Sequence, residues 1–263
     1  RNINLLKYIA WMFDRKHTPE ETSGARSYED RRNAERDRQA EQSLAGRDIG
    51  QLPEVVNPDR KAACERNFQL FCESYFPETY SLAWSPDHLK VIEKIETAVL
   101  RGGLFALALP RGSGKTTITE SAALWSMLYG HREFVVLIGA TESAALELLD
   151  SLKTELEVNE RLAEDFPEVC YPVAQLEGIA NRCAGQLYKG ERTRITWTSN
   201  EIVLPTVEGS RASGIIVRVA GITGRIRGMK FKRSDGRNVR PSLVVIDDPQ
   251  TSESAGSLEQ TRK

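Results

Sequence analysis

The stretch Leu104-Phe-Ala-Leu-Ala-Leu-Pro-Arg-Gly-Ser-Gly-Lys-Thr-Thr117 decides the fold class of this 263-residue chain. Its first six residues form a continuously apolar run, which is typical of a strand buried on both faces of a parallel sheet. The glycines that follow allow the backbone to turn tightly, so that its N–H groups converge. Residues 115–129 then have a helical pattern. We therefore expect a strand, a glycine-rich loop and a helix in succession.

Two more apolar runs bounded by turn residues, 134–138 and 243–246, have the same strand character. A helical pattern over residues 142–157 follows the first of them. This alternation predicts an α/β fold, a three-layer αβα sandwich with a mainly parallel central sheet. Residues 194–206 predict a hairpin in the same domain.

The sequence before residue 104 predicts helices and, at its start, a charged segment. Residues 60–76 and 86–101 have apolar positions at helical spacing, and Ser85 followed by proline is typical of a helix start. Residues 1–50 predict a helical or partly disordered charged segment, either solvated or binding a partner. One α/β domain is expected over residues 51–263. Because the chain begins at Arg and stops soon after an acidic motif, we expect a piece of a longer protein, truncated at its C-terminal end.

The composition, 40% hydrophobic and 28% charged residues, is typical of a soluble globular protein. A net charge of -1 excludes general coating by nucleic acid, so any such contact needs a local patch. Residues 224–240, with seven basic residues and one acidic residue, are the best candidate, although a basic loop without a partner has the same composition. Four cysteines without zinc-ligand spacing predict free thiols. No membrane contact is expected, because the longest apolar run near the start is too short to span a bilayer.

The glycine-rich loop has the chemistry of a Walker A motif. Its N–H groups, at the positive end of a helix, would surround phosphate oxygens. Lys115 would reach the β- and γ-phosphates, and the Thr116 hydroxyl would bind Mg²⁺. The pattern departs from the full motif because Leu109 stands in place of the first glycine. The alternative is a glycine-rich turn that only caps a helix.

The apolar run 243–246 ends in Asp247-Asp248-Pro, which has the pattern of a Walker B motif. Asp247 would lie beside the Mg²⁺ held by Thr116, and Asp248 would orient the attacking water. Glu is common at the second position, and Asp is one methylene shorter. An acidic pair at a strand end is otherwise a frequent turn signal.

Three blocks of this sequence resemble the ATPase domain of phage large terminase subunits, which is a P-loop NTPase. They are residues 109–117, residues 219–228 (Val-Ala-Gly-Ile-Thr-Gly-Arg-Ile-Arg-Gly) and Val244-Val-Ile-Asp-Asp-Pro249. The arginine in the phosphate loop, combined with Asp-Asp-Pro, is fairly specific to this family. The resemblance covers roughly residues 60–263.

The resemblance implies an ATP-hydrolysing motor with ATP and Mg²⁺ as cofactors. Arg111 would sense or stabilise the γ-phosphate, and Arg227 is a second candidate, acting on its own or a neighbouring subunit. His88 lies where such ATPases place their adenine-contacting segment. The predicted ATP-binding residues are Arg111, Gly112, Ser113, Gly114, Lys115, Thr116, Thr117 and His88. The predicted catalytic residues are Lys115, Asp248, Arg111 and Arg227, and the predicted metal ligands are Thr116 and Asp247.

The same resemblance implies that the motor moves double-stranded viral DNA into a procapsid, in the host cytoplasm. Its partners would be the DNA, the small terminase subunit, the portal protein and copies of itself in a ring. A nuclease domain would follow Lys263 in the full protein. Two other functions stay open: a helicase-like remodelling ATPase, and a nucleotide-binding assembly module that hydrolyses ATP weakly.

Overall fold

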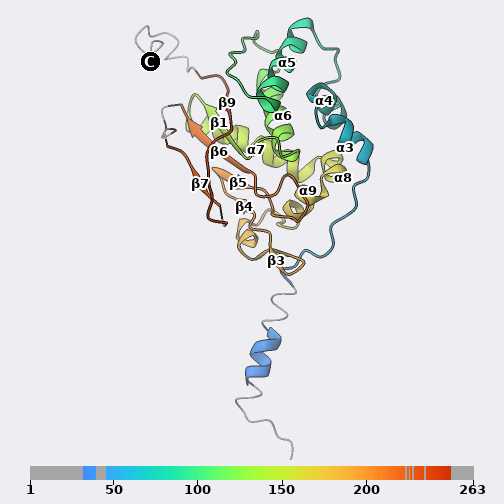
Figure 1. Cartoon of the computed structure of the whole chain (residues 1–263), viewed down its shortest axis with the longest axis vertical. Coiled ribbons are helices and arrows are strands. Elements are labelled where there is room, and N and C mark those ends of the chain that lie inside the picture. Colours follow the sequence, from blue (N-terminus) through green and yellow to red (C-terminus); the bar gives the residue numbers. More distant parts are fainter. Residues whose placement is uncertain are drawn as a thin grey trace, which may run out of the picture. The chain divides into compact units, whose positions relative to one another are not determined.

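The computed structural model describes residues 32–39, 46–222, 224, 226, 228–233 and 235–249. Contacts between residues divide the chain into two units, Arg1–Gly46 and Arg47–Lys263. In the first unit, residues 32–39 are helical and their side chains are mostly exposed. Residues 1–31 of the predicted N-terminal segment lie outside the described residues. The second unit contains the sheet and the helices from α3 onward (Figure 1).

Five strands of the second unit form one sheet in the order β4-β5-β6-β1-β9 (Figure 1). They are β1 (Phe134–Gly139), β4 (Thr196–Trp197), β5 (Glu201–Val203), β6 (Ile216–Gly221) and β9 (Leu243–Ile246). Strand β1 pairs in parallel with both β6 and β9, whereas β4 and β5 add an antiparallel hairpin to the other edge of β6. The mixed α/β fold, the two strands predicted at 134–138 and 243–246, and the hairpin are therefore confirmed.

Strand β6 was not expected, because Arg218 interrupts its apolar run. In the sheet this arginine lies opposite Glu201 of β5, and its Nε donates a 2.6 Å hydrogen bond to Glu201 Oε2. The guanidinium also lies over the rings of Phe134 and Phe231, 5.8 and 5.9 Å from their centroids. The charge is thus neutralised by residues from neighbouring strands, which a local pattern does not reveal.

The second unit also contains several helices. Its described α-helices are α3 (Pro58–Cys64), α4 (Phe68–Tyr75), α5 (Pro86–Leu100), α6 (Lys115–Leu128), α7 (Glu142–Val158), α8 (Glu160–Asp165) and α9 (Pro167–Ala174). The predicted start of α5 is confirmed, since Ser85 caps it by accepting from the backbone N–H of His88. The single helix predicted over 60–76 is wrong: Asn67 caps a second helix there and so splits the segment into α3 and α4. In the described part of the chain, no helix has the length and hydrophobicity needed to cross a membrane.

Two hydrophobic clusters lie on opposite faces of the sheet. The buried hydrophobic side chains of the described helices belong to the larger cluster, together with Val135 and Leu137 of β1. Phe134, Val136 and Ile138, which alternate with them, belong to the smaller cluster. This smaller cluster is closed by a hairpin of β7 (Phe231–Lys232) and β8 (Asn238–Val239). The remaining elements are a 3₁₀ helix and a short strand pair: η1 (Ala180–Gly185), β2 (Leu187–Tyr188) and β3 (Glu191–Arg192). The four cysteines are free, as predicted.

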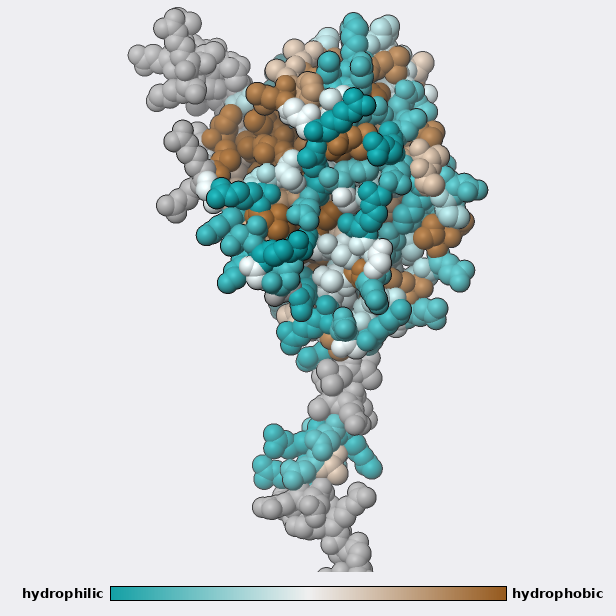
Figure 2. Space-filling model, viewed as in Figure 1, coloured by the Kyte–Doolittle hydropathy of each residue, from teal (hydrophilic) through white to brown (hydrophobic). Residues whose placement is uncertain are grey.

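The strand predicted over residues 104–109 is wrong. This segment has no regular secondary structure, and the side chains of residues 104–108 are exposed, by 98% for Leu104 and 38% for Leu107, whereas Leu109 is partly buried. A buried strand needs pairing partners in the sheet. Among the described residues β9 is the edge of the sheet, so no strand, including residues 104–109, pairs with its outer side. Val244 and Ile246 of β9 are themselves 47% and 52% exposed. Figure 2 shows hydrophobic residues gathered on the part of the surface where Figure 1 labels β9.

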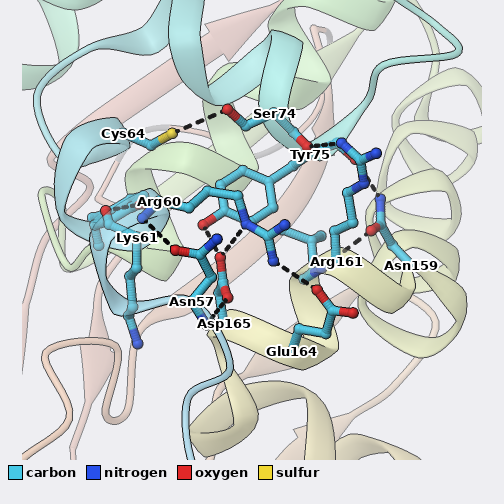
Figure 3. Close-up of polar contacts among 12 residues, drawn as sticks. Asn57, Arg60, Lys61, Cys64, Ser74, Tyr75, Asn159, Arg161, Glu164 and Asp165 are labelled. Carbon is cyan, nitrogen blue, oxygen red and sulfur yellow. Dashed lines mark hydrogen bonds and ion pairs between the residues drawn. The ribbon is translucent and has the colours of Figure 1, made fainter.

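A buried ionic network joins α3 and α4 to α8 (Figure 3). Asp165 is fully buried, and its carboxylate accepts from Arg60 Nε at 2.6 Å and from the Tyr75 hydroxyl at 2.7 Å. The backbone N–H of Asn57 donates to the same carboxylate, and Arg60 also binds Glu164. Because every oxygen of the buried Asp165 carboxylate has a donor, its charge is compensated and the helical layer is tied together.

Candidate functional site

The glycine loop, defined as residues 110–114, ends where α6 begins at Lys115. Gly112 and Gly114 have φ angles of 76° and 71°, in the left-handed region that side chains disfavour. Ser113 Oγ donates to the carbonyl of Pro110 at 2.7 Å and closes the turn. Gly114 is the N-cap and provides no side-chain acceptor, so the first N–H groups of α6 are not capped by a side chain. The loop therefore offers free backbone donors at the positive end of a helix, the arrangement that favours a bound anion.

The first turn of α6 reaches the end of β9. Thr116 Oγ1 donates a 2.8 Å hydrogen bond to Asp247 Oδ2, joining residues 131 positions apart. The backbone N–H of Asp247 donates to the carbonyl of Ile138 at 2.9 Å, which continues the β1–β9 pairing by one residue. The hydroxyl and the carboxylate predicted as metal ligands are therefore adjacent. Both are hard oxygen donors, which suit Mg²⁺.

Two cations predicted to contact phosphate, Arg111 and Lys115, belong to this loop and helix start. Arg111 is exposed and Lys115 is partly exposed. Within the described residues neither side chain has a carboxylate within ion-pair distance. Thr117 contributes its carbonyl to a hydrogen bond from the Tyr80 hydroxyl at 3.1 Å. Both cations are thus available to an anionic ligand at the glycine loop.

His88 contacts the glycine loop through the backbone. Its Nε2 lies 3.1 Å from the Ser113 carbonyl oxygen, and its Nδ1 lies 3.2 Å from Ser85 Oγ. A carbonyl can only accept, so Nε2 is the donor in the contact with Ser113. The structure therefore places His88 as a support of the loop. A contact between His88 and nucleotide stays a prediction.

An aromatic series connects His88 to α6. The Trp84 ring lies 5.9 Å from the His88 ring and 4.9 Å from the Tyr80 ring, measured between centroids. Besides binding Thr117, the Tyr80 hydroxyl lies 2.8 Å from Ser121 Oγ on α6. This series holds the segment before α5 against both the loop and the helix that follows the loop.

Asp248, the predicted water-orienting residue, is exposed and has a φ of 40°. A positive φ is uncommon for residues other than glycine, although Asp is among those that tolerate it. The backbone thus departs from the extended strand conformation at Asp248. Arg227 lies outside the described residues. The catalytic roles of Asp248 and Arg227 stay predictions.

Glu120 is a further acidic residue near the site. It lies one turn after Thr116 on α6 and is partly buried. Burial raises its pKa to about 7, a hydrogen bond with Ser151 opposes that rise, and the charges of Asp247 and Glu155 add to it. Sequence reasoning did not name Glu120, although its i, i+4 spacing from Thr116 puts both side chains on one face of the helix and so indicates that Glu120 lies near the site.

A cavity of about 600 Å³ opens at the carboxyl end of β6. Its lining includes Glu142, Arg218, Gly221 and Lys230, and none of the glycine-loop residues. Gly221 allows a close approach here, because a Cβ atom would lie 2.8 Å from the backbone nitrogen of Glu142 at the start of α7. The carboxyl edge of the parallel strands thus carries both the cavity and the Thr116–Asp247 pair.

Comparisons of the chain with protein-family models, with curated proteins and with solved structures gave no match. The function is therefore inferred from the residues of the site and their geometry. Three features support the inference: the glycine loop at the start of α6, the two cations near that loop, and the Thr116–Asp247 hydrogen bond.

Proposed function

We propose that this chain is the ATP-hydrolysing part of a DNA-packaging motor, a terminase large subunit with a P-loop NTPase fold. The observation that carries the proposal is the 2.8 Å hydrogen bond from Thr116 Oγ1 to Asp247 Oδ2. In such ATPases, Mg²⁺ is held by a hydroxyl at the start of the helix and a carboxylate at the end of a strand, which lie next to each other. A turn that only caps a helix has no need of that carboxylate. In the proposed fold, further elements on the second face of the sheet would complete the three-layer αβα sandwich.

The residues present fit ATP and Mg²⁺. Thr116 and Asp247 would hold the metal, which neutralises charge on the phosphates when it is bound. The N–H groups of the glycine loop, with Lys115 and Arg111, would bind the phosphates. Asp248 would orient water toward the γ-phosphate, and Arg227 would add a positive charge from the same or a neighbouring subunit. Catalysis here consists of positioning and charge stabilisation.

The proposal extends to the partners of such a motor. Double-stranded DNA would be the translocated substrate, and the small terminase subunit, the portal protein and other copies in a ring would assemble with it. The setting would be the host cytoplasm, and DNA cleavage would belong to a separate nuclease domain. The support for these partners is the sequence resemblance together with the nucleotide-site geometry.

A second candidate is a nucleotide-binding assembly module with little hydrolysis. The observation that favours it is the exposed position and positive φ of Asp248, a short side chain on a sharply turned backbone. In that case the chain would bind nucleotide as a structural switch. The rate of turnover, and its response to duplex DNA, separates the two candidates.

We predict that the purified protein hydrolyses ATP, that duplex DNA stimulates the turnover, and that Lys115→Ala abolishes it. Loss of the lysine removes a charge from the phosphates in the transition state, so a decrease of at least about 100-fold is expected. The measurement is phosphate release with and without duplex DNA. Lys90→Ala is the matched control, because Lys90 is an exposed lysine of α5 paired with Asp87. ATP binding without turnover in the unaltered protein would favour the assembly module, and equal turnover in the Lys115→Ala variant would contradict the site itself.

A further inference from the structure

The hairpin β7–β8 has two chemically different faces. Phe231 and Val239 lie opposite each other in the strand register and belong to the smaller hydrophobic cluster. Side chains alternate along a strand, so Lys232 and Arg240 lie on the face turned away from the sheet. Lys230, which directly precedes β7, lines the cavity at the carboxyl end of β6. All three are exposed. We define these three residues as the basic ribbon.

The charges of the basic ribbon are not neutralised by the part of the chain that the structure describes. No described carboxylate lies within ion-pair distance of Lys230, Lys232 or Arg240. The other two described arginines of the hairpin differ: Arg237 is paired with Asp235 at 2.8 Å, and Arg233 donates to the Gly214 carbonyl at 2.9 Å. The hairpin therefore uses two cations for its own structure, and three other described cations are exposed. Figure 2 shows hydrophilic residues over the region where Figure 1 labels β7.

We propose that the basic ribbon is a contact surface for the phosphate backbone of duplex DNA. This inference rests on the proposed function, because it names the surface that would meet the translocated substrate. Lys230 and Lys232 flank Phe231, so their Cα atoms are at most about 7 Å apart, and Arg240 follows Val239 on the facing strand. The three cations therefore form a compact group that can meet several phosphates of one backbone. A two-stranded ribbon is also narrow enough to enter the major groove.

An anionic membrane surface suits the basic ribbon less well. Proteins that lie on membranes insert exposed aromatic or aliphatic side chains beside their lysines. Here Phe231 and Val239 pack inward against the sheet, and the outward face is polar. The chain has a net charge of -1, so its overall field would not attract a polyanion and the contact must be local.

The test is the salt dependence of duplex DNA binding, measured by fluorescence anisotropy on the purified protein. The variant Lys230→Gln/Lys232→Gln/Arg240→Gln is expected to bind at least about 10-fold more weakly near 0.1 M salt. The slope of log affinity against log salt should fall by about 2.7, which is about 0.9 for each phosphate that the protein no longer neutralises. The control Arg66→Gln/Lys90→Gln/Arg101→Gln removes the same charge from exposed positions elsewhere and should change neither quantity. The single variant Lys232→Gln, with an expected slope change of about 0.9, covers the case in which the triple variant does not fold.

The proposal is overturned if the ribbon variants and the protein without substitutions have the same affinity and slope. It is also overturned if the control triple variant binds as weakly as the ribbon triple variant, or if the protein binds phosphatidylserine vesicles but not the duplex. Failure of the ribbon is distinguishable from failure of the proposed function. If the protein hydrolyses ATP but its duplex binding does not depend on the basic ribbon, the proposed motor function is retained and the ribbon proposal is rejected. If duplex binding depends on the ribbon but ATP is not hydrolysed, the ribbon proposal is retained and the motor function is rejected.

Discussion

The smallest unit of the candidate site is the pair Thr116 and Asp247. A hydroxyl donates to a carboxylate at 2.8 Å, and each residue is held by its own element, Thr116 by α6 and Asp247 by its backbone bond to Ile138. Both positions are therefore fixed before any ligand arrives. Such preorganisation lowers the cost of assembling a metal site, because little conformational entropy remains to be lost.

Glu120 gives a pH prediction at the same scale. Its pKa is raised from 4.5 to about 7 by burial first and then by nearby negative charges. The folded protein therefore holds a proton that the unfolded chain releases, so its free energy of unfolding falls as pH rises from about 4.5 to about 7. We expect Glu120→Gln to remove this fall and to stabilise the protein at pH 8 by about 1–2 kcal/mol, a figure reduced for solvent screening of a half-buried group.

The measurement is urea unfolding of both proteins from pH 5 to pH 8, in EDTA and without nucleotide. Glu147→Gln, an exchange of the same type on the neighbouring helix α7, is the control for the substitution itself. Identical pH profiles of the unaltered protein and Glu120→Gln would contradict the raised pKa.

At the scale of elements, the glycine loop depends on the start of α5. The rings of Tyr80, Trp84 and His88 form a series, and His88 Nε2 donates to the Ser113 carbonyl. A loop with two glycines at positive φ has high conformational entropy when free, so an external hydrogen bond helps to hold it in one shape. The aromatic series thus links the N-terminal helices to the nucleotide site that we propose.

We expect His88→Ala to weaken ATP binding by about 3- to 10-fold, since one hydrogen bond of about 1 kcal/mol that orders the loop is lost. His88→Gln, which keeps an N–H donor, should recover part of the affinity. Isothermal titration of a non-hydrolysable ATP analogue with Mg²⁺ measures both. Leu89→Ala, at the next position, is the control for general damage to α5. Unchanged affinity in His88→Ala would show that the loop keeps its shape without this hydrogen bond.

At the scale of the whole molecule, the buried network around Asp165 joins segments that are far apart in the sequence. Its bond to Arg60 spans 105 residues, and its bond to Tyr75 spans 90. Helices α3 and α4 are thereby fastened to α8, in the layer that also packs against α6. Contacts of this range close long loops of the chain, so they hold together parts of the helical layer that are distant in the sequence.

We expect Asp165→Asn to lower the free energy of unfolding by about 3 kcal/mol, because the Arg60 guanidinium would lose its buried counter-charge. Glu164→Gln is the matched control: its carboxylate binds the same arginine but is 43% exposed, so a decrease below about 1 kcal/mol is expected. Urea unfolding followed by circular dichroism gives both values. Equal decreases in the two variants would mean that burial does not decide the strength of this network.

Much of the fold was predictable because it depends on residues close together in the sequence. The uninterrupted apolar run of β1, the Ser85 cap of α5 and the glycine loop before α6 are each encoded within a few positions. The identities of Thr116 and Asp247 were predictable for the same reason, since their motifs are local. Strand β6 was missed because Arg218 is neutralised only by Glu201 of the neighbouring strand.

The sequence by itself therefore determined the α/β class, the helices α5, α6 and α7, and the chemical character of the loop. The tertiary structure alone decided which segments became neighbours. It left residues 104–108 exposed, because an apolar run becomes a buried strand only when it pairs with neighbouring strands, and this run pairs with none of the described strands. It also brought Thr116 to Asp247 across 131 positions, because the pairing of β9 with β1 places the end of β9 beside the start of α6. Local patterns fix backbone preference, whereas contacts between distant segments depend on how all the elements pack together.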